Sequence, residues 1–235
     1  MKQKQMVWDL PVRVFHWALA ASFVAAYAIS DSERWRNLHV AFGYTVAALV
    51  AFRLLWGFIG THHARFASFR YRPTEAIAYL REIATGRARH YTGHNPAGSW
   101  AVYAILVLAA GTAVSGYLTL NEIGGDAFEE VHEFLANAWL VVVAFHVAGV
   151  IASSLAHREN LARAMVTGYK RGAGERPAAA GLGVNAMGLA VAAAVIGFWS
   201  WTMLTGGGAI SSAEAADEWH DGEHLLVEDH EKDDD

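Results

Sequence analysis

The chain has 235 residues, of which 54% are hydrophobic, nine are tryptophan and none is cysteine. This apolar composition, gathered in long blocks with polar gaps between them, is typical of an integral membrane protein rather than of a soluble domain. The lack of cysteine excludes disulfides, thiolate zinc sites, iron–sulfur clusters and covalently attached c-type haem. The formal net charge of −5 predicts little, because the charged residues are distributed unevenly.

Five apolar blocks are long enough to cross a bilayer, which takes about 20 residues. We place them, in chain order, at residues 11–30, 39–59, 99–120, 134–155 and 181–205. Tryptophans assigned to the block ends, Trp56 and Trp139 among them, indicate an interfacial belt. Between the second and third blocks, residues 74–85 (TEAIAYLREIAT) predict a short amphipathic helix on the membrane surface.

The positions of lysine and arginine predict the orientation. Fourteen of the 18 precede or open the first block, separate the second block from the third, or follow the fourth, and these segments share one side. Positive residues are retained in the cytoplasm. We therefore expect a multi-pass protein of the bacterial cytoplasmic (inner) membrane with a cytoplasmic N-terminus and a periplasmic C-terminus.

The blocks divide the chain into four parts. Residues 1–171 are expected to form a four-helix membrane domain, and the Gly/Ala-rich residues 172–180 a linker. Residues 181–205 form a fifth transmembrane helix, which has no polar residue suited to binding a metal within the membrane. Residues 206–235 are expected to form an acidic periplasmic tail, which its composition predicts to be disordered.

Four histidines in the apolar blocks are the candidate metal ligands. His132 and His146 lie 14 residues apart in the fourth block, which returns to within roughly 40° of one helix face and about 21 Å along the axis. With the predicted orientation, depth pairs His39 with His132 near the outer side and His16 with His146 near the inner side. Each pair could supply both axial ligands of a haem iron.

A histidine in a membrane helix also has a simpler explanation. One imidazole taken alone more often hydrogen-bonds a neighbouring helix than binds a metal. Four histidines at matching depths, two of them on one helix face, favour two haem b centres and electron transfer between them.

Two arginines are candidate contacts for haem propionates. Arg13 lies one helical turn before His16, on the same face, although ordinary anchoring at the cytoplasmic surface explains it equally well. Arg53 lies within the second block, where an unpaired charge is costly, so a partner is expected. His94, in the run GHNP, could help to hold a quinone headgroup or a propionate, or simply form a turn.

Three runs carry a resemblance to a known family: VWDLPVRVFHW, HVAFGYTVAALVAFRLLWGFIGTHHARFASF and YTGHNPAG. They resemble the bacterial cytochrome b561 family, and within it the branch related to the b-type cytochrome subunit of nickel–iron hydrogenases. The resemblance covers residues 8–171. It implies an all-α, four-helix core holding two haem b groups, with His16, His39, His132 and His146 at the positions of the family's ligands.

The resemblance also implies exchange of electrons with membrane quinone and with a redox protein. We expect the partner to be a periplasmic c-type cytochrome or a subunit of the dehydrogenase or hydrogenase type, in a lipid membrane and without nucleic acid. A homo-oligomer is left open, and the chain is interpreted as an electron-transfer subunit rather than a stand-alone enzyme. The alternative is a membrane anchor or assembly subunit without turnover of its own. A histidine-lined divalent-metal transporter is disfavoured, because Asp and Glu are essentially absent from the five blocks.

Overall fold

The computed structural model of the chain describes residues 4–171 and 181–205. Within them the elements, in chain order, are β1 (Lys4–Met6), α1 (Leu10–Ala28), η1 (Glu33–Trp35), α2 (Arg36–Ile59), η2 (Phe66–Phe69), α3 (Pro73–Ala84), α4 (Pro96–Leu120), α5 (Asp126–His157), α6 (Leu161–Thr167), β2 (Tyr169–Arg171) and α7 (Leu182–Leu204). The predicted linker and acidic tail lie outside the described residues.

Five of the described helices are long and apolar enough to cross a membrane, and they are α1, α2 with the preceding η1, α4, α5 and α7. Each of the five blocks expected to span the membrane is therefore helical. The short amphipathic helix expected at residues 74–85 is present as α3. The protein is accordingly a mostly helical membrane protein.

Local sequence explains where the helices begin. The Asp9 carboxylate caps α1 by accepting a hydrogen bond from the Val12 N–H, at 2.8 Å. Asn95 caps α4 in the same way, with Pro96 directly after it. Helix α5 begins eight residues earlier than the predicted block, because Gly124 and Gly125 adopt positive φ and turn the chain into it.

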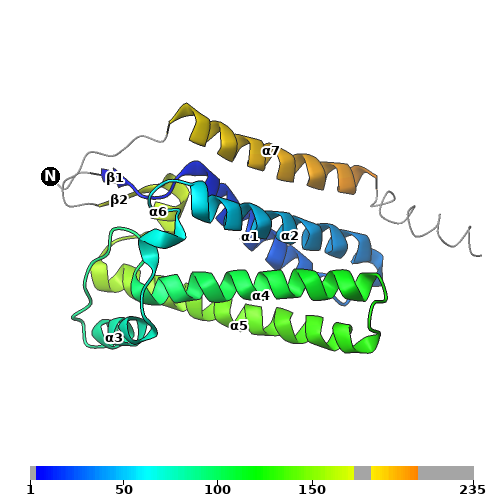
Figure 1. Cartoon of the computed structure of the whole chain (residues 1–235), viewed down its shortest axis with the longest axis horizontal. Coiled ribbons are helices and arrows are strands. Elements are labelled where there is room, and N and C mark those ends of the chain that lie inside the picture. The colour runs from blue at the N-terminus through cyan, green and yellow to red at the C-terminus, as the bar shows by residue number, and fades with distance from the viewer. Residues whose placement is uncertain (1–3, 172–180, 206–235) are drawn as a thin grey trace, which may run out of the picture.

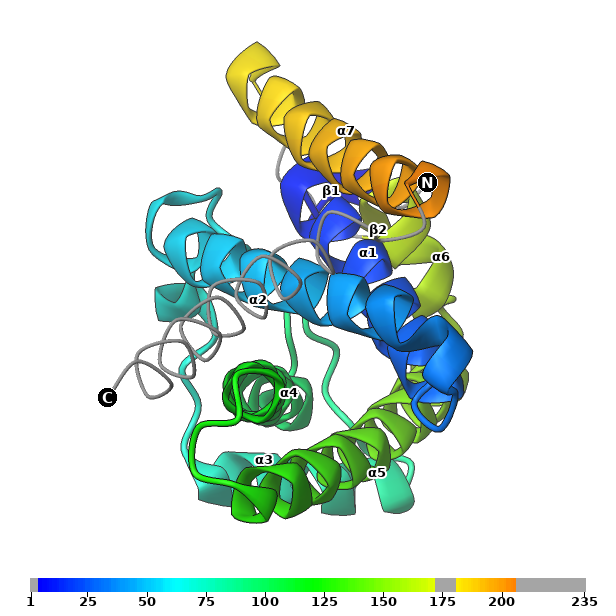
Figure 2. The same cartoon turned by 90° about the vertical axis from the view of Figure 1, so that its right-hand side faces the viewer.

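The four core helices run alternately up and down, and α7 lies outside them (Figure 1). Figure 2 looks along α4, with α1 and α2 on one side of it and α5 on the other. Helix α5 packs along α4, whereas within the described residues its backbone stays largely clear of α1 and α2. Helix α7 packs mainly against α1. This arrangement separates the α1–α2 pair from α5.

A two-stranded sheet joins the start of the core to its end. Strand β1 pairs antiparallel with β2, with Lys4 opposite Arg171. The N–H groups of Val7 and Trp8 both donate to the Gly168 carbonyl. Gly168 has φ +86° and a Cβ there would lie 2.7 Å from the Trp8 carbonyl oxygen, so glycine is needed. We call this side of the molecule, which also carries α3 and α6, the β end (Figure 1).

Two tryptophans assigned to an interfacial belt are buried within the protein. Trp139 is 2% exposed, in the core midway along α5, and packs against Phe23 of α1. Trp56 is also buried, where its indole N–H donates to Asp9 at 3.0 Å. The interfacial interpretation of Trp139 was therefore wrong, whereas Trp56 lies in the last turn of α2, at a helix end as predicted, with its side chain buried in the protein. The prediction that α5 begins near residue 134 had placed Trp139 too close to the end of its helix.

Candidate functional site

His39 of α2 and His132 of α5 face each other at the end of the bundle opposite the β end. Their ring centroids lie 6.1 Å apart, with the ring planes at 72°. An imidazole–metal bond is about 2 Å long, so two rings that share one metal ion have centroids about 6 Å apart. The spacing of this pair therefore matches two axial ligands on one metal.

Hydrogen bonds orient both rings of this pair. The Nδ1–H of His39 donates to the Ala26 carbonyl at 2.9 Å, and that of His132 donates to the Thr112 carbonyl at 2.9 Å. A carbonyl only accepts, so Nδ1 carries the proton in each ring. The lone pair of a neutral imidazole is then on Nε2. Such a partner on the other ring nitrogen is the usual support of a metal-binding histidine.

Gly116 on α4 makes room for His132. A Cβ at this position would lie 2.8 Å from Cε1 and 3.0 Å from Nδ1 of the imidazole. The ring cannot easily move away, because it is bonded to the Thr112 carbonyl and lies 3.3 Å from the Ser115 hydroxyl. Because Gly116 has no side chain, the His132 ring can pack directly against the α4 backbone, and this close packing fixes the position of the ring.

The second predicted pair, His16 of α1 and His146 of α5, lies nearer the β end. These two imidazoles are close enough to interact electrostatically. The Nδ1 of His16 is buried and has no hydrogen-bond partner among the described residues. An unsatisfied buried nitrogen costs about 1–3 kcal/mol. A ligand bound at this ring would explain why His16 is nevertheless buried here.

Side chains of α1 and α5 meet between the two histidine levels. Phe23 and Trp139 have ring centroids 4.1 Å apart, and the Tyr27 hydroxyl donates to the Asn137 side-chain oxygen at 2.7 Å. Trp139 is seven residues from each α5 histidine. The aromatic pair therefore lies between the two histidine pairs along α5. The sequence did not predict this aromatic pair, because it depends on a contact between distant segments.

Arg53 is a buried cation on the same helix as His39. It is 2% exposed, its guanidinium lies 4.9 Å from the centre of the Phe66 ring, and its Nη1 has no hydrogen-bond partner among the described residues. The expectation that this buried charge has a partner is met by the Phe66 ring and by the electrostatic attraction of Asp9 and Tyr103. The free Nη1 leaves it able to bind an anion.

Asp9 is a buried carboxylate that sequence reasoning did not single out. It is 2% exposed and accepts hydrogen bonds from Val12, Trp56 and Thr61. The run WDLP before the first block is a signal for a helix cap and could have identified it. Its attraction to Arg53 depends on the folded arrangement.

His94 lies in the loop before α4, packed between Trp8 and Phe69 with ring centroids 4.6 and 4.3 Å away. Burial lowers the pKa of His94 to about 3, and the positive charges of Arg53 and Lys170 act in the same direction. Its Nδ1 is buried without a hydrogen-bond partner among the described residues. His94 is thus a neutral imidazole beside the buried Arg53.

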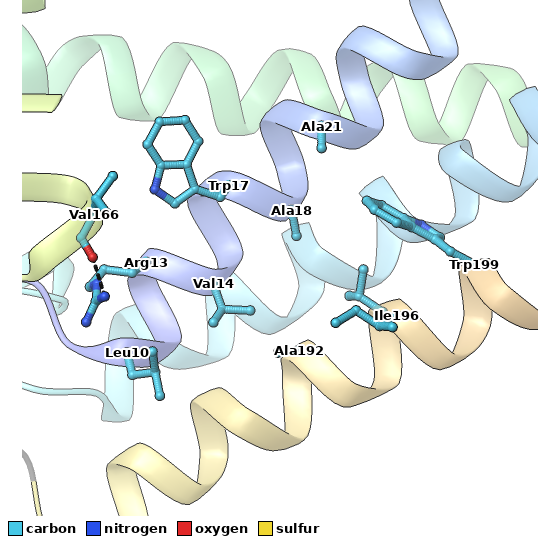
Figure 3. A pocket seen from close by; sticks show the side chains of 11 residues that line it. Leu10, Arg13, Val14, Trp17, Ala18, Ala21, Val166, Ala192, Ile196 and Trp199 are labelled. Carbon is cyan, nitrogen blue, oxygen red and sulfur yellow. Dashed lines mark hydrogen bonds between the residues drawn. The ribbon is translucent and has the colours of Figure 1, made fainter. Parts of the chain in front are cut away.

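Arg13 lies in a different environment from Arg53. Its guanidinium donates to the Val166 carbonyl and borders a cavity between α1 and α7 (Figure 3). The predicted contact between Arg13 and a propionate stays a prediction.

Together these features fit haem b better than a metal cage. Among the described residues, no group of three or more His, Asp or Glu side chains is placed to hold a metal ion. The His39–His132 pair instead offers two opposed nitrogens, and α5 is held away from the α1–α2 pair. A mostly helical membrane protein with opposed histidines on two of its helices has the features expected of the b-type cytochrome class.

Comparison with known proteins gives the family. Residues 7–168 match the family described as prokaryotic cytochrome b561, and the chain belongs to this family. Membership makes it a membrane electron-transfer protein of the haem b class. The match ends before α7.

Curated relatives are similar to the chain at low identity. A probable Ni/Fe-hydrogenase B-type cytochrome subunit of Azotobacter vinelandii is 26% identical over 218 residues, which cover 73% of this chain and 90% of the relative. Proteins of the same description from Bradyrhizobium diazoefficiens and Cupriavidus necator are 23% and 24% identical over 212 residues. They cover 70% of this chain, and 85% and 86% of the relatives. No solved structure matches the chain significantly.

Proposed function

We propose that this chain binds two b haems and transfers electrons between the quinone pool and a redox partner protein. One haem is bound by His39 and His132, the other by His16 and His146. The observation that carries the proposal is the His39–His132 pair, 6.1 Å apart with both Nδ1 atoms bonded to carbonyls. The spacing of 14 residues to His146 repeats the site about 21 Å along α5.

Bound haem b supplies one-electron redox chemistry at each site. The residues of this chain do the rest: the Ala26 and Thr112 carbonyls hold the first pair of imidazoles in the tautomer that binds iron. Phe23 and Trp139 fill the space between the sites and exclude water and lipid from it. Arg53 supplies a buried positive charge for a propionate of the haem nearer the β end.

The positive-inside rule makes the β end cytoplasmic, so the His39–His132 site lies near the periplasm. The relatives are named as subunits of Ni/Fe-hydrogenases. We therefore propose a periplasmic redox partner, of the hydrogenase or dehydrogenase type or a c-type cytochrome, docked near His39 and His132. The quinone is the other redox partner, in the membrane.

The first test is the haem itself. Purified protein is expected to hold two haem b per chain and to show b-type bands in reduced-minus-oxidised spectra. A protein that folds and carries no haem would overturn the proposal and favour the anchor or assembly function.

The second test is transfer across the membrane. In proteoliposomes that enclose ferricyanide, an external quinol should reduce the trapped ferricyanide, and the His146→Ala variant should be inactive. Haem-loaded wild-type protein that leaves ferricyanide oxidised would contradict the quinone-linked function.

A further inference from the structure

The cavity between α1 and α7 has no part in the proposed electron transfer. Its volume is about 440 Å³, and residues of α1, α6 and α7 line it (Figure 3). Its walls are almost wholly apolar, with Arg13 as the charged lining residue among those described. The cavity extends away from Arg13 toward Trp199.

Small side chains keep this space open. Ala18 and Ala21 on α1 and Ala192 on α7 line it, whereas Gly188, nearer the β end, brings the two helices into close contact. The lining runs from Leu10 to Ala21, which is about 16 Å along the helix axis. One leaflet is half of a hydrocarbon core of about 30 Å. The length of the groove therefore matches the depth of one leaflet.

Arg13 stands at the β end of this groove. Its Nη2 donates to the Val166 carbonyl, while its Nε is buried and has no hydrogen-bond partner in the described part of the chain. Within residues 4–171 and 181–205, no carboxylate lies within ion-pair distance of its guanidinium. An arginine at the mouth of an apolar groove, with its charge not neutralised, complements an anion that carries an apolar chain.

We propose that the groove binds one anionic phospholipid, with its phosphate on Arg13 and an acyl chain between α1 and α7. Basic pockets between transmembrane helices at the cytoplasmic side bind such headgroups, and the predicted orientation places Arg13 on that side. A quinone tail has similar apolar chemistry, but its neutral headgroup gains little from a cation. The charge of Arg13 therefore favours the phospholipid.

Native mass spectrometry of the purified holoprotein tests this, because one spectrum reports bound haem and bound lipid together. The protein is titrated with phosphatidylglycerol or with zwitterionic phosphatidylethanolamine. Arg13→Gln is compared with Arg163→Gln, which removes an exposed arginine from α6 outside the groove. Ala192→Leu, which fills the groove, is compared with Ala193→Leu on the exposed side of α7.

We expect Arg13→Gln to weaken phosphatidylglycerol binding about fivefold, the factor that corresponds to about 1 kcal/mol for one arginine near anionic lipid. Binding of phosphatidylethanolamine should hardly change. Ala192→Leu should weaken both lipids, and both control variants should bind like the wild type. All four variants should keep the wild-type haem count.

Three results would overturn the proposal. Equal binding of phosphatidylglycerol by wild type and Arg13→Gln would show that Arg13 does not bind the headgroup. Displacement of the lipid by a quinone, insensitive to Arg13→Gln, would make quinone the occupant. Loss of a haem in Arg13→Gln alone would assign the arginine to a propionate, one of the two interpretations that the sequence left open.

Discussion

The ring centroids of His39 and His132 lie 6.1 Å apart, on helices α2 and α5, whose backbones make few or no other contacts among the described residues. Each ring is held by a carbonyl on the helix next to its own, Ala26 on α1 and Thr112 on α4. Four helices thus contribute to one pair of opposed nitrogens. A substitution at any of these contacts should therefore alter the orientation of His39 or His132.

Single substitutions test how the histidines pair. His39→Ala and His132→Ala should each remove the same haem, identified by its spectrum and midpoint potential, and leave one haem per chain. His16→Ala and His146→Ala should each remove the other. Because the two residues of a pair act as a unit, the His39→Ala/His132→Ala double variant should lose no more than either single one. Loss of different haems from His39→Ala and His132→Ala rejects the pairing.

Gly116→Ala should disturb the site without removing a ligand. The added methyl would lie 2.8 Å from the His132 ring, and such overpacking costs roughly 1–3 kcal/mol. We expect partial loss of the haem at His39 and His132, measured as haem per chain, and a lower thermal stability. Gly197→Ala, where a Cβ meets nothing within 4 Å, is the matched control. Full retention of that haem in Gly116→Ala would show that the ring can move aside.

Arg53→Gln should lower the midpoint potential of the haem at His16 and His146. Loss of a buried positive charge favours the oxidised, more positive state, and the shift should be on the order of tens of millivolts. Redox titration of the purified protein measures it. Arg65→Gln removes an exposed arginine from the segment that follows α2 and should leave both potentials unchanged. A shift in the potential of the His39–His132 haem alone would contradict the placement of Arg53 near the His16–His146 haem.

His94 should make stability fall in acid. The pKa of His94 is lowered from 6.5 to about 3 in the folded protein, so its contribution is complete above pH 6.5. As the pH falls below 6.5, the unfolded chain takes up a proton that the folded chain does not, and stability decreases.

The measurement is the apparent melting temperature between about pH 7 and pH 4, where His94→Gln should show a shallower decrease than the wild type. His62→Gln, at an exposed histidine nearby, should retain the wild-type slope. Parallel curves for His94→Gln and the wild type would mean that His94 does not contribute to the decrease in stability at low pH.

Much of this protein is determined by local sequence. The five spans follow from apolar length, and the caps at Asp9 and Asn95 from residues next to their helices. The α5 stripe of His132 and His146 follows from helical periodicity alone. These features need only the residues within a few turns of the position concerned, so a single sequence contains them.

Tertiary structure decided the features that join distant segments. Trp139 lies in the core because Phe23 of α1 packs on it, more than 100 residues earlier in the chain. The orientation of His132 depends on Thr112 and Gly116, and the cavity beside Arg13 on the approach of α7 to α1. Such contacts depend on how whole helices pack, and the periodicity of one helix contains no information about its neighbours.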